Sequence, residues 1–364
     1  MSTAYINGTI FTGNGVETGK AILITGKTIE GLVPATDIPS HYIQHDLNGL
    51  NIAPAFIDLQ IYGGNGRLFS HAPDVASLQA TYEYCLQGGC TAFMITMATN
   101  TIETFLKGFY AAMAYIQQGG KGLLGVHLEG PYINPAKRGA HLADCIKRPI
   151  VEEVELLLKK GAAVFKMMTI APEQCDAPVI ELLQRNNILL SAGHSNATYQ
   201  QAIQAFNNGI PAATHLFNAM SPLQHRAPGM VGAVFNHATV MSSIVCDGIH
   251  VDFAAVRIAQ QIMQQRLFFI TDAVTATAGD YPHILKNNHY VLPDGTLSGS
   301  ALTMMQCVKN AVEHAGIDLA EALRMASTYP ARLLPELRKG KIEKGYDAEL
   351  VVFDNSFNIT ALIY

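Results

Sequence analysis

The sequence has no hydrophobic run long enough to cross a membrane, no paired cysteine motif and no cluster of basic residues. No apolar stretch approaches the roughly 20 residues that a transmembrane helix needs. The six cysteines are scattered without a C-x-x-C pair, which favours free thiols in a reducing compartment over a disulfide framework. The formal net charge of −5 gives no electrostatic case for nucleic-acid binding.

The first residues also lack a basic segment followed by an apolar one, so we expect no secretory signal and a cytoplasmic location. The chain has enough hydrophobic residues for a large buried core, because 49% of its 364 residues are hydrophobic and only 15% are charged. This length and composition fit one large α/β domain with an appendage, or two domains.

The two ends of the chain share a texture of short apolar pieces separated by turns. Such pieces occur at Ala21–Thr25 near the start and at Ala348–Phe353 near the end. Neither end is large enough to fold alone. We therefore expect residues 1–52 and 336–364 to form one small β domain, a β-sandwich, around an inserted central domain of residues 53–335.

The central region alternates apolar strands with amphipathic helices, which favours a closed parallel (β/α)8 barrel over an open sheet. The expected strands are Ala55–Gln60, Ala92–Thr96, Leu124–Glu129, Val164–Thr169, Ile188–Ala192, Ala212–His215, Ser243–Cys246 and Phe268–Asp272. The clearest expected helices are Val75–Gln87, Ile102–Ile116, Val151–Lys160 and Thr198–Asn207.

Polar residues close several of these strands, where the active sites of such barrels lie. They are Gln60, Glu129, His194, His215 and Asp272. A carboxylate and two imidazoles can bind one divalent metal ion and leave a position open for water. A further carboxylate can then move the proton of that water. The pattern therefore predicts a metal hydrolase with Glu129, His194 and His215 as ligands and Asp272 as acid/base.

Simpler readings exist for each residue. A lone buried histidine commonly packs or caps, Asp272 could cap a helix, and Glu129 could pair with Lys166 or Arg138. His127 shares the face of Glu129 one layer deeper, which suits packing better than ligation. Lys166, on the fourth strand, could carry a carbamate between two metals or form an ion pair inside the barrel.

Three glycine-rich or irregular segments have local interpretations. Ala21–Thr28 loosely matches a phosphate-binding loop, but its apolar interior makes Gly26-Lys27 a hairpin turn. Residues Gly63–Gly66 follow the first strand and either present backbone amides at the barrel mouth or only turn the chain. The segment Ser221–Gly229 is irregular and proline-containing, so we expect a functional loop.

Taken together, the motifs resemble the N-acetylglucosamine-6-phosphate deacetylases of the amidohydrolase superfamily over nearly the whole chain. The segments that carry the resemblance are Pro54–Asp58, His127–Tyr132, Gly193–Thr198, Thr214–Met220, Asp247–Asp252, Thr271-Asp272 and Gly295–Ser300. The resemblance implies a (β/α)8 barrel with a small terminal β-sandwich, a homodimer, and a role in amino-sugar catabolism.

The resemblance also implies roles for individual residues. Glu129, His194 and His215 would bind the metal, Asp272 would be the acid/base, and His141 would contact the acetyl carbonyl. Substrate binding, including the sugar phosphate, would fall to a further group, in which Arg226 reaches across the dimer interface: Asn218, Ala219, Arg226 and His250.

One departure from the wider superfamily concerns the metal count. Many members carry H-x-H at the end of the first strand, which supplies a second metal site. Here Gln60 and Tyr62 stand at those positions, and neither replaces imidazole well as a ligand for zinc or iron. We therefore expect one divalent ion per subunit, zinc first, with iron, manganese or cobalt as alternatives.

The expected reaction is hydrolysis of N-acetylglucosamine 6-phosphate to glucosamine 6-phosphate and acetate. Two rivals stay open. One is a related hydrolase, such as a deacetylase of N-acetylgalactosamine 6-phosphate or another amidohydrolase-superfamily amide hydrolase. The other is a catalytically silent barrel that serves as a scaffold. We expect no nucleic-acid partner and no membrane association.

Overall fold

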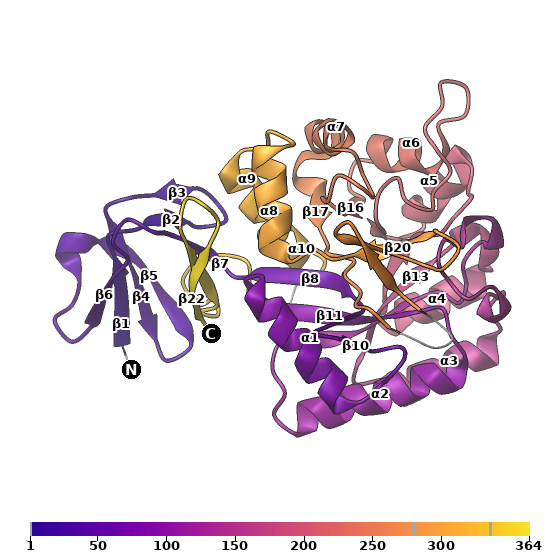
Figure 1. Cartoon of the computed structure of the whole chain (residues 1–364), viewed down its shortest axis with the longest axis horizontal. Helices are drawn as coiled ribbons and strands as arrows, with labels where there is room; N and C mark the ends of the chain where they lie inside the picture. The colour runs from indigo at the N-terminus through magenta and orange to yellow at the C-terminus, as the bar shows by residue number, and fades with distance from the viewer. Residues whose placement is uncertain (1, 278–281, 335–336) are drawn as a thin grey trace.

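The central part of the chain forms an eight-stranded parallel barrel in the computed structural model, which describes residues 2–277, 282–334 and 337–364 (Figure 1). Neighbouring strands pair in sequence order, each parallel to the next. The barrel strands are β8 (Phe56–Ile61), β11 (Cys90–Ala98), β12 (Leu123–Glu129), β13 (Phe165–Ile170), β14 (Leu189–Ala192), β15 (Ala212–Ala213), β16 (Met241–Ile244) and β17 (Leu267–Phe269).

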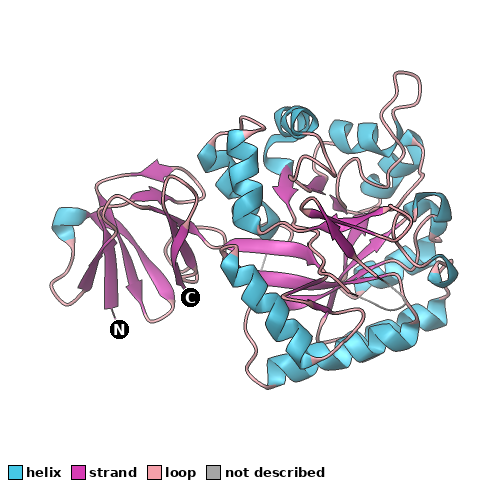
Figure 2. Cartoon of the chain, in the orientation of Figure 1, coloured by secondary structure: helices cyan, strands magenta, loops and turns pink. Residues whose placement is uncertain are grey.

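Helices follow the strands and surround the barrel, as the cyan ribbons of Figure 2 show. They are α1 (Val75–Gln87), α2 (Ile102–Gln117), α3 (Val151–Gly161), α4 (Ala177–Arg185), α5 (Tyr199–Asn207), α6 (Gly229–Asn236), α7 (Phe253–Met263), α8 (Met304–Glu313), α9 (Leu319–Ala326) and α10 (Thr328–Ala331). Among the described residues, no helix is long and apolar enough to span a bilayer. The predicted (β/α)8 barrel is confirmed.

The barrel closes between its first strand and the residues that follow its last one. Asp272 N donates to Gln60 O at 3.0 Å, and Tyr62 N donates to Ala273 O at 3.0 Å. The buried Asp58 on β8 strengthens the seam, because its carboxylate accepts from both the backbone N–H and the hydroxyl of Thr271. Closure therefore places Gln60 beside Asp272, although 212 residues separate them.

A small β unit lies beside the barrel and is built from both ends of the chain (Figure 1). One sheet, ordered β5-β4-β1-β6, contains β1 (Ser2–Ile6), β4 (Lys20–Thr25), β5 (Thr28–Pro34) and β6 (Ile43–Asp46). The other, ordered β22-β21-β7-β2-β3, contains β2 (Thr9–Phe11), β3 (Val16–Glu17), β7 (Asn51–Pro54), β21 (Leu350–Phe353) and β22 (Ile359–Ile363). Its buried residues, such as Ile22, Ile52 and Leu350, form a core separate from that of the barrel.

Three short strands form a sheet that was not predicted from the sequence. They are β18 (Ile284–Lys286), β19 (His289–Val291) and β20 (Leu297–Ser300), inserted between β17 and α8.

The pairing of neighbouring strands shows the conformation of two segments that were predicted to turn. Gly26-Lys27 joins β4 to β5 as a two-residue hairpin. Gly63–Gly66 turns the chain, because β9 (Gly63–Gly64) pairs with β10 (Arg67–Leu68).

The expected strand ends differ from the structure at two functional positions. β15 ends at Ala213 rather than at His215, and β17 ends at Phe269 rather than at Asp272. Both residues have left-handed backbone angles, φ 38° for His215 and 54° for Asp272, which a strand ladder does not accommodate. The two expectations for Lys166 are wrong, because its side chain is exposed on β13 and not inside the barrel.

Candidate active site

The candidate residues leave the strands at the same end of the barrel and turn inward. His194 follows β14 with φ 46°, and His215 and Asp272 share this left-handed conformation. Such angles are strained for residues other than glycine and concentrate at functional sites. Gly193 makes room for the turn, since an added Cβ would lie 2.8 Å from side-chain atoms of both Thr169 and Thr214.

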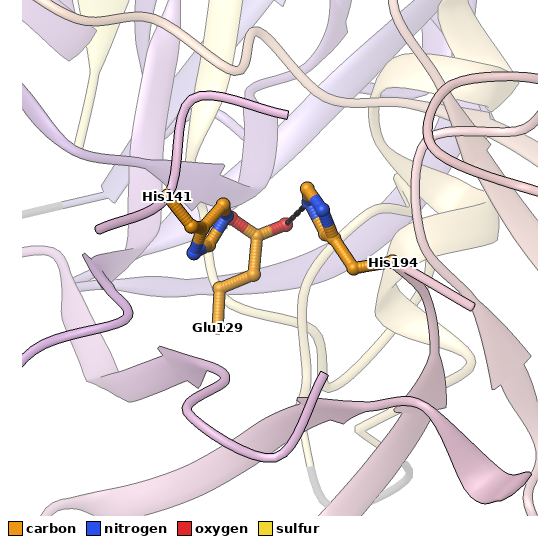
Figure 3. A group of neighbouring side chains, drawn as sticks. All are labelled: Glu129, His141 and His194. Atoms are coloured by element: carbon orange, nitrogen blue, oxygen red, sulfur yellow. Dashed lines mark hydrogen bonds and ion pairs between the residues drawn. The ribbon is translucent and has the colours of Figure 1, made fainter. Parts of the chain in front are cut away.

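One carboxylate lies at the centre of three imidazoles. Glu129 Oε1 is 3.1 Å from His215 Nε2 and 3.3 Å from His194 Nε2, and the two Nε2 atoms are 3.0 Å apart. Glu129 Oε2 is 3.0 Å from His141 Nε2. Figure 3 shows the Glu129 carboxylate between His141 and His194. The sequence-predicted ligands therefore meet at one point, together with His141.

Two ligand sets are geometrically available, because Glu129, His141 and His194 also offer donor atoms within 4.8 Å of one another. The hydrogen bonds made by the ring nitrogens that face away from Glu129 show which histidines can be metal ligands and which cannot. His141 Nδ1 accepts from the backbone N–H of Thr99 at 3.1 Å, so the proton of the neutral ring is on Nε2. His141 is thus a hydrogen-bond donor toward Glu129.

His194 and His215 have the opposite tautomer. Nδ1 of His194 lies 2.8 Å from the carbonyl oxygen of Lys137, and Nδ1 of His215 lies 3.1 Å from that of Asn218. A carbonyl oxygen only accepts, so each Nδ1 carries the proton and each Nε2 presents a lone pair. Two lone pairs and a carboxylate oxygen then face one another with no proton between the rings.

This donor set fits a divalent cation. Ligands about 2.0–2.1 Å from a tetrahedral ion lie roughly 3.3 Å from one another. The three separations among Glu129 Oε1, His194 Nε2 and His215 Nε2 are 3.0–3.3 Å. His127 does not join the set, because Nδ1 meets the carbonyl of Leu59 and Nε2 meets the hydroxyl of Thr169.

Gln60 and Tyr62 fill the space where the superfamily pattern would place further ligands. Gln60 Nε2 lies 3.0 Å from Glu129 Oε1 and 2.8 Å from Asp272 Oδ1. The Tyr62 hydroxyl donates to Glu129 Oε2. Both side chains therefore act as hydrogen-bond donors to the carboxylates, which is consistent with a single cation in the site.

Burial and charge set the ionisation of the two carboxyl groups. Burial alone would raise the pKa of Glu129, but with no cation bound the protonated imidazoles of His194 and His141 outweigh burial and hold the pKa well below its usual range. Glu129 is therefore an anion that can bind a cation. Burial raises the pKa of Asp272, with the His215 charge opposing and the Glu129 charge adding to the rise. A raised pKa suits a group that accepts and returns a proton.

These side chains line a cavity of about 390 Å³, a size that suits a small ligand. The other predicted site residues that line this cavity are His141, Asn218, Ala219 and His250. The amide nitrogen of Asn218 is buried without a hydrogen-bond partner. His250 Nδ1 donates a hydrogen bond to Asp247 Oδ2 at 2.6 Å, because a carboxylate oxygen only accepts, and this contact fixes the orientation of the ring.

Arg226 is the one predicted site residue outside this cavity in the single chain. It lies in the exposed loop between β15 and α6 and borders a second cavity of about 310 Å³ with Asn196 and Tyr199. Within one chain the structure does not bring Arg226 to the cluster of imidazoles around Glu129.

Sequence reasoning missed two residues that shape the site. Thr99 orients His141 through its backbone N–H, and the carbonyl of Lys137 orients His194. Thr99 carried a usable signal, because it directly follows an apolar strand at the catalytic end of the barrel. Lys137 carried none, since its contribution comes from the backbone.

Family models match nearly the whole chain. The model of the amidohydrolase family matches residues 51–363, and that of the NagA composite domain matches residues 4–52. The chain belongs to the amidohydrolase family. The barrel and the terminal β unit described above are therefore those of a family member.

Several characterised proteins resemble the chain over its full length. N-acetylglucosamine-6-phosphate deacetylase of Haemophilus influenzae is 35% identical, with 100% of this chain and 98% of that protein aligned. The crystal structure of the Pasteurella multocida deacetylase of the same name superposes with a TM-score of 0.94 at 35% identity, covering 100% of this chain and 98% of that one.

More distant relatives include a substrate complex and a second specificity. A mutant of the Mycobacterium smegmatis deacetylase in complex with N-acetyl-D-glucosamine 6-phosphate superposes with a TM-score of 0.92 at 28% identity, covering 100% of this chain and 97% of that one. N-acetylgalactosamine-6-phosphate deacetylase of a Shewanella strain is 31% identical over 85% of this chain and 81% of that protein.

Proposed function

We propose that this protein hydrolyses the acetamide of N-acetyl-D-glucosamine 6-phosphate, giving D-glucosamine 6-phosphate and acetate. The observation that carries the proposal is the division of tautomers around Glu129. Two imidazoles present lone pairs, a third presents an N–H, and Asp272 lies in the same cavity. Relatives that match the full chain carry this deacetylase name.

Glu129, His194 and His215 would hold one divalent metal ion, zinc first among the candidates. Carboxylate and imidazole ligands also accept iron, manganese or cobalt, so the metal is identified by measurement. When bound, such an ion supplies Lewis acidity that acidifies water and polarises a carbonyl.

The chain's own residues carry the proton transfers. Asp272 accepts a proton from the attacking water molecule and later returns it to the sugar nitrogen as the amide C–N bond breaks. His141 Nε2–H, held in that tautomer by Thr99, donates a hydrogen bond to the acetyl oxygen as negative charge develops on it. Water and amide are consumed, and amine and acetate leave.

The phosphate would bind at the opposite side of the substrate from the acetamide. Asn218 offers its unpartnered amide nitrogen, Ala219 its backbone, and His250 an imidazole that Asp247 holds in place. Arg226 would complete the site from the second subunit of a homodimer, which explains its place outside the cavity of its own chain. We further propose a cytoplasmic role in amino-sugar catabolism.

The galactosamine epimer is a second candidate substrate, because the Shewanella relative acts on N-acetylgalactosamine 6-phosphate by name. The glucosamine enzyme is favoured by the higher identity and fuller coverage of the Haemophilus relative.

The deciding experiment measures acetate release from a panel of N-acetyl hexosamines, each with and without a 6-phosphate. We expect the highest kcat/KM for N-acetylglucosamine 6-phosphate. Highest activity on the galactosamine epimer would move the assignment to the second candidate. Metal binding with no acetate release from any sugar would support the silent scaffold instead.

The metal is tested on protein purified without added metal. Elemental analysis is expected to find one divalent ion per chain, and a chelator should abolish acetate release until the ion is restored. Two ions per chain, found reproducibly, would contradict the single-site interpretation of Gln60 and Tyr62.

A further inference from the structure

A buried glutamine joins the two carboxylates of the active site. Gln60, on β8, is 1% exposed. Its Nε2 lies 2.8 Å from Asp272 Oδ1, 3.0 Å from Glu129 Oε1 and 3.0 Å from the Tyr62 hydroxyl. The reverse amide orientation would place a carbonyl oxygen against two carboxylates. The partners therefore fix the NH2 group, and not the oxygen, on this side.

Three oxygen atoms compete for the two hydrogens of this amide. Glu129 Oε1 has other partners, because it also faces the lone pairs of His194 and His215. A cation bound by those three atoms would satisfy Oε1 without Gln60. Both amide hydrogens would then be available to Asp272 and Tyr62.

Gln60 contacts both the side chain and the backbone of Asp272. Besides the side-chain contact, the backbone N–H of Asp272 donates to Gln60 O at 3.0 Å. Within the described part of the chain, no other side chain hydrogen-bonds to the Asp272 carboxylate. The backbone of Asp272 has φ 54°, outside the strand, so the ladder of β17 does not orient it.

We propose that Gln60 is a positioning residue for catalysis: its amide N–H holds the Asp272 carboxylate in the orientation that accepts the proton of water and returns it to nitrogen. Gln60 does not touch the reacting atoms in this account and acts only through Asp272. The inference rests on the proposed deacetylase function.

The first test replaces the amide by a side chain of similar length without donors. Gln60→Met is expected to lower kcat for N-acetylglucosamine 6-phosphate by about 10- to 100-fold, because a misoriented acid/base costs this much. KM should change less than about threefold, and one metal ion per chain should remain. Gln184→Met is the matched control, since it removes an amide donor on the outer helix α4 and should leave all three values unchanged.

A double-mutant cycle separates positioning from a general structural effect. If Gln60 acts through Asp272, Gln60→Met should cause no further loss of kcat in an Asp272→Asn background. Gln60→Leu, which removes both donors without adding a charge, repeats the test if the methionine variant is unstable.

Three results would overturn the inference: full kcat in Gln60→Met, multiplicative losses in the cycle, or loss of the metal with the amide. Each leaves the deacetylase assignment intact, because the wild-type enzyme would still release acetate from the phosphorylated sugar. Failure of the wild type to do so would instead defeat the proposed function.

Discussion

At the scale of single residues, the site is organised by which ring nitrogens carry protons. The backbone groups of Thr99, Lys137 and Asn218 set the tautomers of three histidines that otherwise look alike in sequence. Two become candidate metal ligands and one becomes a donor. The same carboxylate, Glu129, faces both kinds through its two oxygen atoms.

The role of Asp272 is tested by an isosteric change. Asp272→Asn keeps the shape and an oxygen that can accept from Gln60, but the amide cannot accept and return a proton. We expect kcat to fall by about 10²-fold or more, while metal content and the Kd for substrate stay close to wild type. Single-turnover acetate release at increasing enzyme concentration gives the rate and the Kd, and elemental analysis gives the metal content. A variant with near-normal kcat would remove Asp272 from the mechanism.

The buried imidazole of His127 is expected to make the free energy of unfolding depend on pH. Burial lowers its pKa to about 4, against an ordinary value of 6.5 in the unfolded chain. Between these values the unfolded state binds a proton that the folded state excludes. Stability that is complete above pH 6.5 is therefore lost as the pH falls toward 4, by on the order of 3 kcal/mol.

The measurement compares urea unfolding of the metal-free wild type and His127→Gln at pH 7 and pH 4.5, so that release of a metal ion does not contribute. The wild type should lose more stability over this interval than the variant. Equal losses in the two proteins would show that another group dominates.

The sequence predicts which residues lie together in the site, but it does not predict which histidine acts as a hydrogen-bond donor. Four residues could be brought together because each lies at or just past the end of an apolar strand, and parallel strands of a barrel end at one mouth. They are Glu129, His194, His215 and Asp272. The donor role of His141 came only from resemblance. Its physical cause is the backbone N–H of Thr99, and no residue pattern encodes which nitrogen a distant backbone group will meet.

At the scale of elements, long amphipathic patterns were predictable and short polar strands were not. The helix Val75–Gln87 has the bounds expected from its sequence, because its apolar face and its Asp74 cap are both local signals. The strands β18, β19 and β20 span three or four residues each and contain polar side chains. They exist through pairing with one another, which periodicity in a single segment does not reveal.

The hairpin of β9 and β10 makes an element-level prediction about Gly63. A Cβ at this position would lie 2.2 Å from the carbonyl oxygen of Arg67, a backbone atom that cannot move alone. We expect Gly63→Ala to destabilise the protein by about 2 kcal/mol and to lower activity, because Tyr62 precedes the hairpin. Gly15→Ala is the control, since nothing lies within 4 Å of its added Cβ. Similar Tm values for both variants would refute the argument.

At the scale of the whole molecule, we propose that the barrel is joined by a small domain from the two chain ends and by a second subunit. We propose that residues 1–52 and 336–364 act as one small domain, because strands from both ends pair in one sheet. The predicted boundary between residues 335 and 336 itself lies outside the described residues. The boundary could be anticipated from similar texture at the two ends. The second subunit was implied only by the family resemblance, and the exposed position of Arg226 outside the active-site cavity of its own chain supports it.

The dimer proposal is tested by complementation between two impaired variants. Arg226→Ala should lose most of the preference for phosphorylated over unphosphorylated sugar, since Arg226 would supply a charge-assisted hydrogen bond to phosphate. Asp272→Asn should be inactive. A mixed dimer of the two contains one complete site if Arg226 acts across the interface: the Asp272 of one chain meets the intact Arg226 of its partner.

Co-expression with two affinity tags isolates this mixed dimer. Acetate release from N-acetylglucosamine 6-phosphate should rise to about half the wild-type rate per dimer, because one of two sites is whole. A matched mixed dimer of Asp272→Asn with the wild type gives the same single site without complementation and calibrates that value. If Arg226 served its own subunit, the mixed dimer would stay as impaired as Arg226→Ala, and the proposed interface role would be wrong.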